Sequence, residues 1–231
     1  MISRYCIMAG EDYRNPKLEN EIDRYESRAA IDLSFRQLND EDMVIVVKQA
    51  IVEKQCTALL LNDNLITSKG ASIIANGLYD NTTLEELNLW NNQVSDLGVF
   101  CLSKVLSVKN FTLRSIALGQ NGISDIGAQH LAEMLKINQM VTRLWLFNNE
   151  IGDRGMQALV DALAHENKSL QWLDLRLNKL VTDSSFDAVA NMLKSNQSLN
   201  KFWMEYCNLS RPVKAKIREI GQAKEDFDIG A

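Results

Sequence analysis

One polar position recurs through this chain at intervals of 28 or 29 residues. Asparagine occupies the five central copies and other residues occupy the first and the last. The series is Arg36, Asn64, Asn92, Asn121, Asn149, Asn178 and Cys207. A period this regular indicates that one supersecondary unit is stacked on itself, and it has to be interpreted before any local motif. We therefore expect a single elongated array rather than one or two ordinary globular domains.

Each asparagine closes the same phrase of apolar residues. Leu84, Leu87, Leu89 and Asn92 spell L-x-x-L-x-L-x-x-N, and the next two copies repeat it. Alternation over L-x-L predicts a short strand with two leucines facing inward and the intervening positions facing out. The asparagine amide carries two donors and an acceptor on a short stem, so we expect it to bond the backbone in a ladder that runs through the stack.

A helix is predicted after each turn. The Ser or Asp of Ser95-Asp96, Ser124-Asp125 and Gly152-Asp153 can accept hydrogen bonds from free amides of the following turn, as a helix N-cap does. Apolar residues follow at helical spacing, and they would pack against the sheet. One glycine per copy lies at the start of the helix, which we interpret as a packing position. These glycines are Gly70, Gly98, Gly127 and Gly155.

This phrase resembles that of the leucine-rich repeats, and specifically of the ribonuclease-inhibitor-like class, over about residues 28–210. The resemblance implies an α/β solenoid, a horseshoe arc of about seven strand-helix repeats of 28–29 residues. Its parallel sheet would line the concave face and its helices the convex face. It also implies a non-enzymatic scaffold that binds a protein on the concave face. Similar repeats occur in activators of small GTPases, in sensor proteins and in effectors that bacteria deliver into host cells. A regulator of an enzyme such as a small GTPase and a bacterial effector acting on a host protein therefore stay open as alternatives.

Both ends of the array look like caps. We predict an N-terminal leader and capping helix over residues 1–27, the repeat domain over 28–210, and a C-terminal capping helix and tail over 211–231. Asn15-Pro16 opens one helix, whose stripe of Leu18, Ile22 and Tyr25 could cover the first strand, and Arg211-Pro212 opens the other. We expect residues 1–14 and the tail from Glu225 to be less ordered.

Composition disfavours several classes of partner. The net charge is -5 with scattered signs and no basic stripe, which argues against nucleic-acid binding. No apolar run is long enough to span a membrane, and no export signal is recognisable. We expect a monomeric protein without membrane association in a reducing cytoplasm, or in a host cytosol if the chain is a bacterial effector. The four cysteines share no disulfide-like or C-x-x-C spacing, which favours buried reduced thiols.

The sequence holds no recognisable catalytic, metal or cofactor site. The two histidines, His130 and His165, fall on separate predicted outer helices, so neither a zinc cluster nor a histidine base is expected. Four positions fit the glycosylation pattern N-x-[ST], but all fall just before the first leucine of a repeat. This phasing favours a helix-to-strand turn instead. They are Asn81, Asn110, Asn167 and Asn196.

The outward strand positions vary between copies and define the candidate binding site. All four tryptophans fall on them, and three cluster in the last three strands. Aromatic residues mixed with arginine are typical of interface hot spots. The alternative is that the rings only stack along the sheet as a structural ladder. The candidate partner-binding residues are Trp90, Arg143, Trp145, Phe147, Trp172, Asp174, Arg176, Trp203, Glu205 and Tyr206. The first half of this face is mildly acidic, with Asp32, Asp63 and Glu86.

Overall fold

A single parallel sheet runs through the computed structural model, which describes residues 13–110, 112–224 and 226–231. Eight three-residue strands pair in chain order, each in parallel with the next. They are β1 (Ala30–Asp32), β2 (Ala58–Leu60), β3 (Glu86–Asn88), β4 (Ser115–Ala117), β5 (Arg143–Trp145), β6 (Trp172–Asp174), β7 (Lys201–Trp203) and β8 (Asp228–Gly230).

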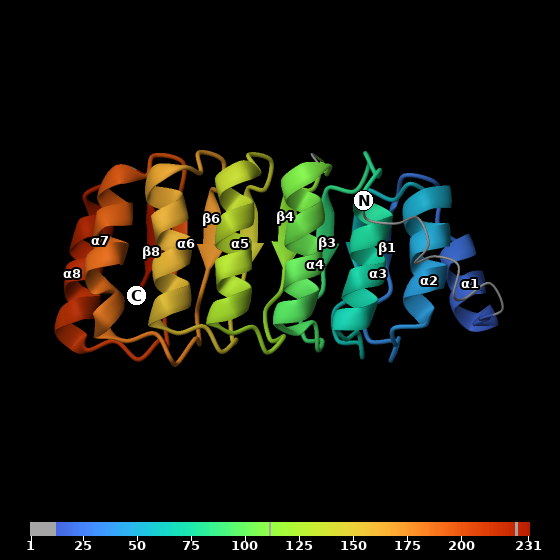
Figure 1. Cartoon of the computed structure of the whole chain (residues 1–231), viewed down its shortest axis with the longest axis horizontal. Coiled ribbons are helices and arrows are strands. Elements are labelled where there is room, and N and C mark those ends of the chain that lie inside the picture. The colour runs from blue at the N-terminus through green and yellow to red at the C-terminus, as the bar shows by residue number, and fades with distance from the viewer. Residues whose placement is uncertain (1–12, 111, 225) are drawn as a thin grey trace.

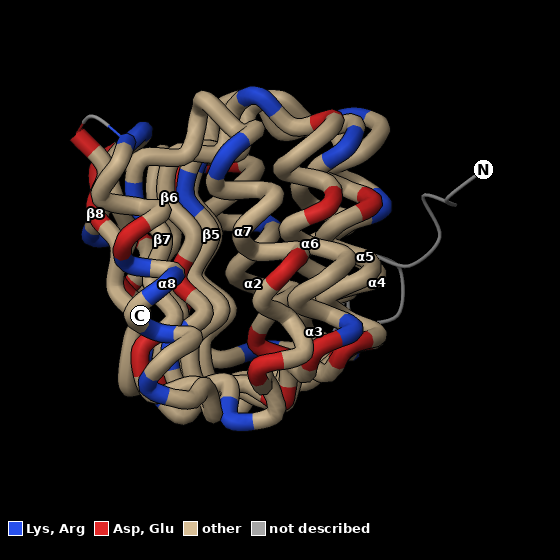
Figure 2. Tube along the Cα trace, turned by 90° about the vertical axis from the view of Figure 1, so that its left-hand side faces the viewer, with Lys and Arg blue, Asp and Glu red and all other residues tan. Residues whose placement is uncertain are grey.

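Helices form the second layer and stand side by side in front of the sheet (Figure 1). They are α1 (Pro16–Asp23), α2 (Asp42–Val46) with its π-helical extension η2 (Val47–Glu53), α3 (Ser68–Leu78), α4 (Ser95–Val108), α5 (Asp125–Ile137), α6 (Asp153–His165), the 3-10 turn η3 (Asp183–Ser185), α7 (Phe186–Ser195) and α8 (Arg211–Gln222). Figure 2 views the stack from one end, with strands on the left and helices α3 to α7 to their right. The predicted α/β solenoid is confirmed, and we call the sheet face turned away from the helices the concave face.

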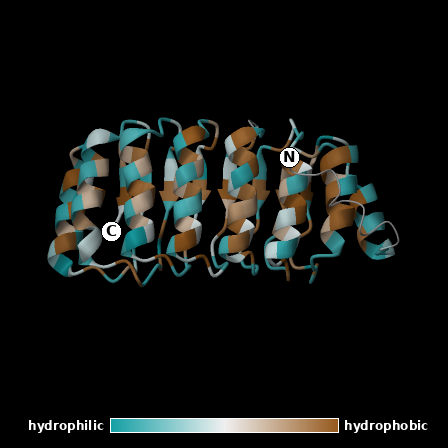
Figure 3. Ribbon diagram, in the orientation of Figure 1, coloured by the Kyte–Doolittle hydropathy of each residue, from teal (hydrophilic) through white to brown (hydrophobic). Residues whose placement is uncertain are grey.

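The core lies between the two layers. The middle residue of each repeat strand is apolar and buried, as Leu87, Leu144 and Phe202 are, because alternation turns it toward the helices. In Figure 3 the strands behind the helices are brown, whereas the helix surfaces toward the viewer mix teal and brown. Corresponding strand positions of consecutive repeats are paired, for example Arg143 with Trp172 and then Lys201. The expected register of the concave face is therefore confirmed.

The asparagine ladder is present. Asn149 Oδ1 accepts from the backbone N–H groups of Asn121 and Ile123 in the preceding repeat, at 2.9 and 3.1 Å. Its Nδ2 donates to the carbonyls of Leu118 and Leu146, both at 3.0 Å. One buried amide thus satisfies backbone groups in two repeats, which ties neighbours together.

A second asparagine ladder runs along the opposite edge, where the helices lead back to the strands. Asn167 is fully buried, and its Nδ2 donates to Leu135 O of the preceding repeat at 2.9 Å. Its Oδ1 accepts from the backbone N–H groups of Ser169 and Leu170. Asn110, Asn138 and Asn196 make equivalent bonds. The turn interpretation is confirmed for all four positions that fit the glycosylation pattern, since Asn81 Oδ1 likewise accepts from the backbone N–H groups of Thr83 and Leu84.

The expected role of the aspartates at the helix starts is wrong in one respect: they bond the next helix, not their own. Asp125 Oδ1 accepts from the N–H groups of Gly152 and Gly155 in the following repeat, at 2.7 and 2.8 Å. The cap of its own helix is the Ser124 hydroxyl, which accepts from the N–H of Ile126 at 3.2 Å. A Cβ at Gly155 would lie 2.7 Å from Asp125 Oδ1, which explains the recurrent glycine.

The N-terminal helix begins at Pro16 and, at Pro16–Asp23, is shorter than expected. Asn15 Oδ1 accepts from the N–H of Leu18, and Leu18 and Ile22 are buried over the first repeat. The Tyr25 hydroxyl donates to Asp32 O at 2.8 Å and accepts from Asp32 N at 3.3 Å, so it occupies backbone groups at the edge of β1. The expectation for residues 1–14 lies outside the described residues except at 13 and 14, where the Tyr13 hydroxyl bonds Asp42.

The expectation of a less ordered C-terminal tail is wrong for residues 226–231. Asp228–Gly230 form β8, which pairs in parallel with β7. The edge of β7 offers free backbone groups, and Met204 N donates to Gly230 O at 2.6 Å. Ile229 lies against Gly221 of α8, where a Cβ would come within 2.7 Å of Ile229. The sheet thus gains a terminal strand that covers the last full repeat.

Candidate functional site

Three tryptophans stack across the last strands of the concave face. The ring centroids of Trp145 and Trp172 are 5.4 Å apart, and those of Trp172 and Trp203 are 4.8 Å apart, both in edge-to-face geometry. All three side chains are half-buried. We call these three residues the tryptophan stack. Edge-to-face rings at this distance attract each other, so the stack is rigid while it leaves apolar surface open to solvent.

Cationic side chains lie over each ring of the stack. The Arg143 guanidinium is 5.9 Å from the Trp145 ring, and Lys201 Nζ is 4.5 Å from the Trp172 ring. The Arg176 guanidinium is 4.6 Å from the Trp203 ring. A cation over the face of an indole is attracted by the ring quadrupole. The surface therefore combines apolar area with positive charge, although the whole chain carries a net charge of -5.

Arg176 is held in place by a carboxylate below it. Asp174 is 0 % exposed, and its two oxygens accept from Arg176 Nε at 3.0 Å and Nη2 at 2.7 Å. This bidentate hydrogen bonding raises the pKa of Arg176, and the nearby Glu205 and Tyr206 raise it further. Asp174 thus positions Arg176 and neutralises it, rather than presenting a carboxylate to a partner.

Strand β8 adds one residue that the sequence analysis missed. Asp228 Oδ2 accepts from Trp203 Nε1 at 3.1 Å, which fixes the last indole of the stack. The sequence does carry a signal for this strand, since Ile229 lies 27 residues after the inward-facing Phe202, with which it pairs. The short Phe227-Asp228-Ile229 alternation alone is too brief to stand out.

Trp90 and Phe147 form a separate pair. Their ring centroids are 5.9 Å apart, although β4 lies between their strands. The pair bridges β4 because Gly119 has no side chain, and a Cβ there would lie 2.6 Å from Phe147 Cε1. Trp90 therefore contacts Phe147 rather than a ring of the tryptophan stack.

The remaining two candidates differ in accessibility. Glu205 lies under the last strand, where a Cβ at Gly230 would collide with its carboxylate, and its Oε2 is buried without a hydrogen bond to any described residue. Tyr206 is 71 % exposed. Of the two, only the tyrosine presents a side chain to a partner.

The first half of the concave face is polar and internally bonded. Hydrogen bonding to Ser34 lowers the pKa of the Asp32 carboxyl, whose Oδ1 accepts from the backbone N–H of Ser34 at 2.9 Å. The Ser34 hydroxyl donates to Asn62 Oδ1, which also accepts from Asn88 Nδ2. These groups satisfy one another, so this half offers fewer open contacts than the second.

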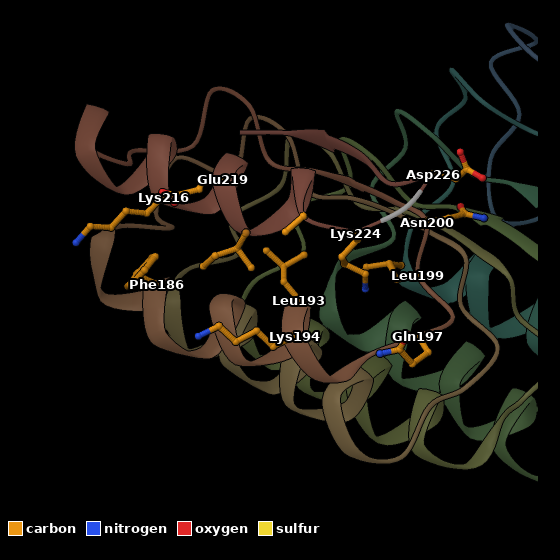
Figure 4. Close-up of a pocket in the computed structure, with 12 residues that line it drawn as sticks. Phe186, Leu193, Lys194, Gln197, Leu199, Asn200, Lys216, Glu219, Lys224 and Asp226 are labelled. Carbon is orange, nitrogen blue, oxygen red and sulfur yellow. The ribbon is translucent and has the colours of Figure 1, made fainter.

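A groove of about 840 Å³ lies between α7 and α8, apart from the tryptophan stack. Figure 4 shows Leu193 lining it, with Lys194 and Lys216 at its margin. Lys224 Nζ donates to Asn196 O at 2.6 Å, and burial lowers the pKa of this amine. The groove mixes cations with Glu219 and Asp226, and it shows no converging set of groups for a defined ligand.

Residues 13–110, 112–224 and 226–231 contain no group of His, Cys, Asp or Glu arranged to hold a metal ion. The helices described in these ranges are all too short or too polar to cross a membrane.

Comparison with known proteins agrees with this geometry. A family model described as "Leucine Rich repeat" matches residues 80–103, 109–132 and 138–160. Over 136 residues the chain is 32% identical to "NACHT, LRR and PYD domains-containing protein 3" of Bos taurus. The aligned region covers 59% of this chain and 13% of that protein. It is 27% identical over 198 residues to "NACHT, LRR and PYD domains-containing protein 14" of Homo sapiens. This alignment covers 80% of this chain and 18% of that protein. The chain thus spans less than a fifth of these relatives.

A solved structure shares the fold. "Leiomodin-1 Actin-Binding Site 2 (ABS2)" superposes with a TM-score of 0.56 at 22% identity, over 80% of this chain and 97% of that one. The three stretches matched by the family model begin near β3, β4 and β5 and run into the helix that follows each strand. They coincide with three consecutive units of the stack, and the chain is therefore a leucine-rich repeat protein.

Proposed function

We propose that this leucine-rich repeat protein is a non-enzymatic scaffold that binds a protein partner on the concave face over β5 to β7. The observation that carries the proposal is the tryptophan stack, whose half-buried rings cross three adjacent strands under Arg143, Lys201 and Arg176. Indole and guanidinium groups offer large contact area with few rotamers to lose, as binding hot spots require. The hydrogen-bonded sheet holds them in place before binding, which lowers the ordering cost.

The structural alternative is that the rings only support each other. The stack does contain mutual contacts, so some loss of stability on truncation is expected under both interpretations. They differ in binding: a purely structural ladder predicts that folded variants keep every partner. Because the rings face solvent rather than the core, we expect the triple variant described next to stay folded.

A pull-down with quantitative recovery tests the proposal. The native chain is compared with a Trp145→Ala, Trp172→Ala, Trp203→Ala variant and with a matched control, Leu60→Ala, Glu86→Ala, on the first half of the same face. Circular dichroism and urea unfolding establish that both variants are folded. We expect partners to be lost from the triple variant and kept by the control. A folded triple variant that retains every partner would show that the patch does not bind.

The narrower roles rest on family resemblance. Regulation of an enzyme such as a small GTPase predicts that nucleotide hydrolysis by candidate GTPases changes when this protein is added. Action as a bacterial effector predicts capture of a host protein through the tryptophan stack. A monomeric, cytoplasmic protein that binds neither nucleic acid nor membranes is our working proposal, and light scattering tests the oligomeric state.

A further inference from the structure

The residue directly before the ladder position has a left-handed backbone in every repeat. These residues have φ between 52° and 63°, and they are Phe35, Asp63, Asn91, Gln120, Asn148, Leu177 and Tyr206. The left-handed region is unfavourable for side chains with a Cβ, and asparagine and aspartate tolerate it best. The choice of residue at this position therefore needs an explanation in each repeat.

In the central repeats the explanation is a third ladder, made of polar side chains. Asn91 Nδ2 donates to Asp63 Oδ1 at 2.6 Å, and Gln120 Nε2 donates to Asn91 Oδ1 at 2.7 Å. Asn148 Nδ2 continues it to Gln120 Oε1 at 3.3 Å. These bonds and the tolerance of asparagine and aspartate account for the polar residues there.

Neither the polar ladder nor the tolerance of asparagine and aspartate explains Tyr206. It is an aromatic residue at φ 62°, its side chain is 71 % exposed, and it forms no side-chain hydrogen bond within the described part of the chain. Packing of the Tyr206 side chain therefore offsets little of the backbone strain. The left-handed turn recurs in all seven repeats and Phe35 shares both the backbone and the exposure, so what distinguishes Tyr206 is a large exposed ring placed beside the tryptophan stack.

The position of Tyr206 connects it to the tryptophan stack. It follows Trp203 by three residues, where the chain leaves β7. Both residues lie near the Arg176 guanidinium: Trp203 provides the ring beneath it, and Tyr206 contributes to its electrostatic surroundings. An exposed aromatic side chain at this edge extends the apolar surface of the stack beyond the sheet.

The charges of this region indicate the chemistry of its partner. Arg176 is neutralised by Asp174, whereas Arg143 and Lys201 form no ion pair with a described carboxylate. Arg143 is exposed, and Lys201 forms no such ion pair although Asp228 lies opposite it in the β7–β8 register, so both cations can accept carboxylates from a partner.

We propose that the docking surface runs from the tryptophan stack over the end of β7 to Tyr206, and that it takes a protein segment with carboxylates for Arg143 and Lys201 and an apolar side chain against Tyr206. This proposal rests on the proposed function of the tryptophan stack. It assigns the occupant a chemistry and adds a contact at the loop edge.

Phe35 provides a matched control. It occupies the same register position in the first repeat, with φ 57° and 68 % exposure, far along the stack from the tryptophans. Asparagine suits the left-handed backbone at both sites, so we expect Phe35→Asn and Tyr206→Asn each to raise Tm, by about 2 to 4 °C. A fall in Tm for Tyr206→Asn would show that the ring has a structural role and would overturn its assignment to the docking surface.

The binding arm uses a displayed library of short random peptides, selected on the native chain. We expect enrichment of peptides that combine Asp or Glu with Leu or an aromatic residue. The enriched peptides should bind Tyr206→Asn about tenfold or more weakly and Phe35→Asn equally well. Enrichment of basic peptides, or of none, would overturn the proposed chemistry.

The same peptides separate the two proposals. Binding that is lost in the Trp145→Ala, Trp172→Ala, Trp203→Ala variant but unchanged in Tyr206→Asn would overturn the extension to the loop edge and leave the proposed function standing. Binding that is unchanged in the folded triple variant would overturn both.

Discussion

Trp203 and Asp228 are joined by a 3.1 Å hydrogen bond from the indole Nε1 to a carboxylate oxygen, across 25 residues of sequence. The bond links the last ring of the tryptophan stack to the strand that closes the sheet. Strand β8 therefore serves two purposes: it pairs with the open edge of β7, and it orients a candidate binding residue.

Removing this acceptor should loosen Trp203 without unfolding the chain. We expect Asp228→Ala to lower the free energy of unfolding by about 0.5 to 1.5 kcal/mol and to shift the tryptophan fluorescence, because the indole N–H loses its partner. Asp228→Asn keeps an acceptor oxygen and is the control, with a smaller effect on both readouts. Urea unfolding and emission spectra provide the measurements. Equal behaviour of the two variants would mean that the hydrogen bond does not orient the ring.

Asp125 accepts hydrogen bonds from the start of the next helix, so it should contribute more to the free energy of unfolding than other half-buried side chains at the surface. Asp125→Ala leaves two N–H groups at the start of α6 without an acceptor, and we expect a loss of about 1 to 2 kcal/mol in urea unfolding. Ser68 occupies the same register position but forms no such bond with a described residue, and α4 begins without a side-chain cap. Ser68→Ala should therefore change stability by less than about 0.5 kcal/mol. Similar losses at both positions would contradict this account.

Some features of this structure could be predicted from the sequence periodicity, and others could not. The faces of each strand follow from alternation alone, so the concave register and the position of all four tryptophans could be predicted from the sequence. The partner of Asp125 could not, because it depends on the offset between adjacent repeats in space rather than on spacing along the chain. Strand β8 was missed because residues 227–231 carry neither the repeated leucines nor the ladder asparagine, and the strand is formed against the edge of β7. The burial of Asp174 beneath Arg176 could not be predicted either, because both residues occupy outward-facing positions in the repeat pattern.

The buried cysteines should be inert in the folded protein. Burial raises the pKa of Cys56 to about 12 and that of Cys207 to about 11. At pH 8 only about one thiol in a thousand would then be a thiolate at Cys207, and fewer at Cys56. We expect a thiol-reactive dye to label these two residues only in denaturant, and mass spectrometry of labelled peptides identifies the sites. Rapid labelling of Cys56 in the native state would contradict the burial.

The same pKa values predict a dependence of stability on pH. The thiol pKa is raised in the folded state above its unfolded value of about 8.5, so the unfolded chain loses these protons first as pH rises. The contribution of both thiols is fully present below about pH 8.5 and declines toward pH 11 and above. We expect a Cys56→Ala, Cys207→Ala variant to lose less stability than the native chain between pH 7 and pH 10. Urea midpoints at the two pH values measure the difference.

The contact between Gly119 and Phe147 can be tested by a double-mutant cycle. A Cβ at Gly119 would lie 2.6 Å from Phe147 Cε1, so Gly119→Ala should push the ring away from Trp90 and cost about 1 to 3 kcal/mol. Leucine at position 147 lacks the clashing ring atoms. In a Phe147→Leu background we therefore expect Gly119→Ala to cost at least about 0.5 kcal/mol less, a coupling that urea unfolding resolves. Additive losses would show that the glycine is required for another reason, and that the pairing of Phe147 with Trp90 across β4 does not depend on the missing side chain.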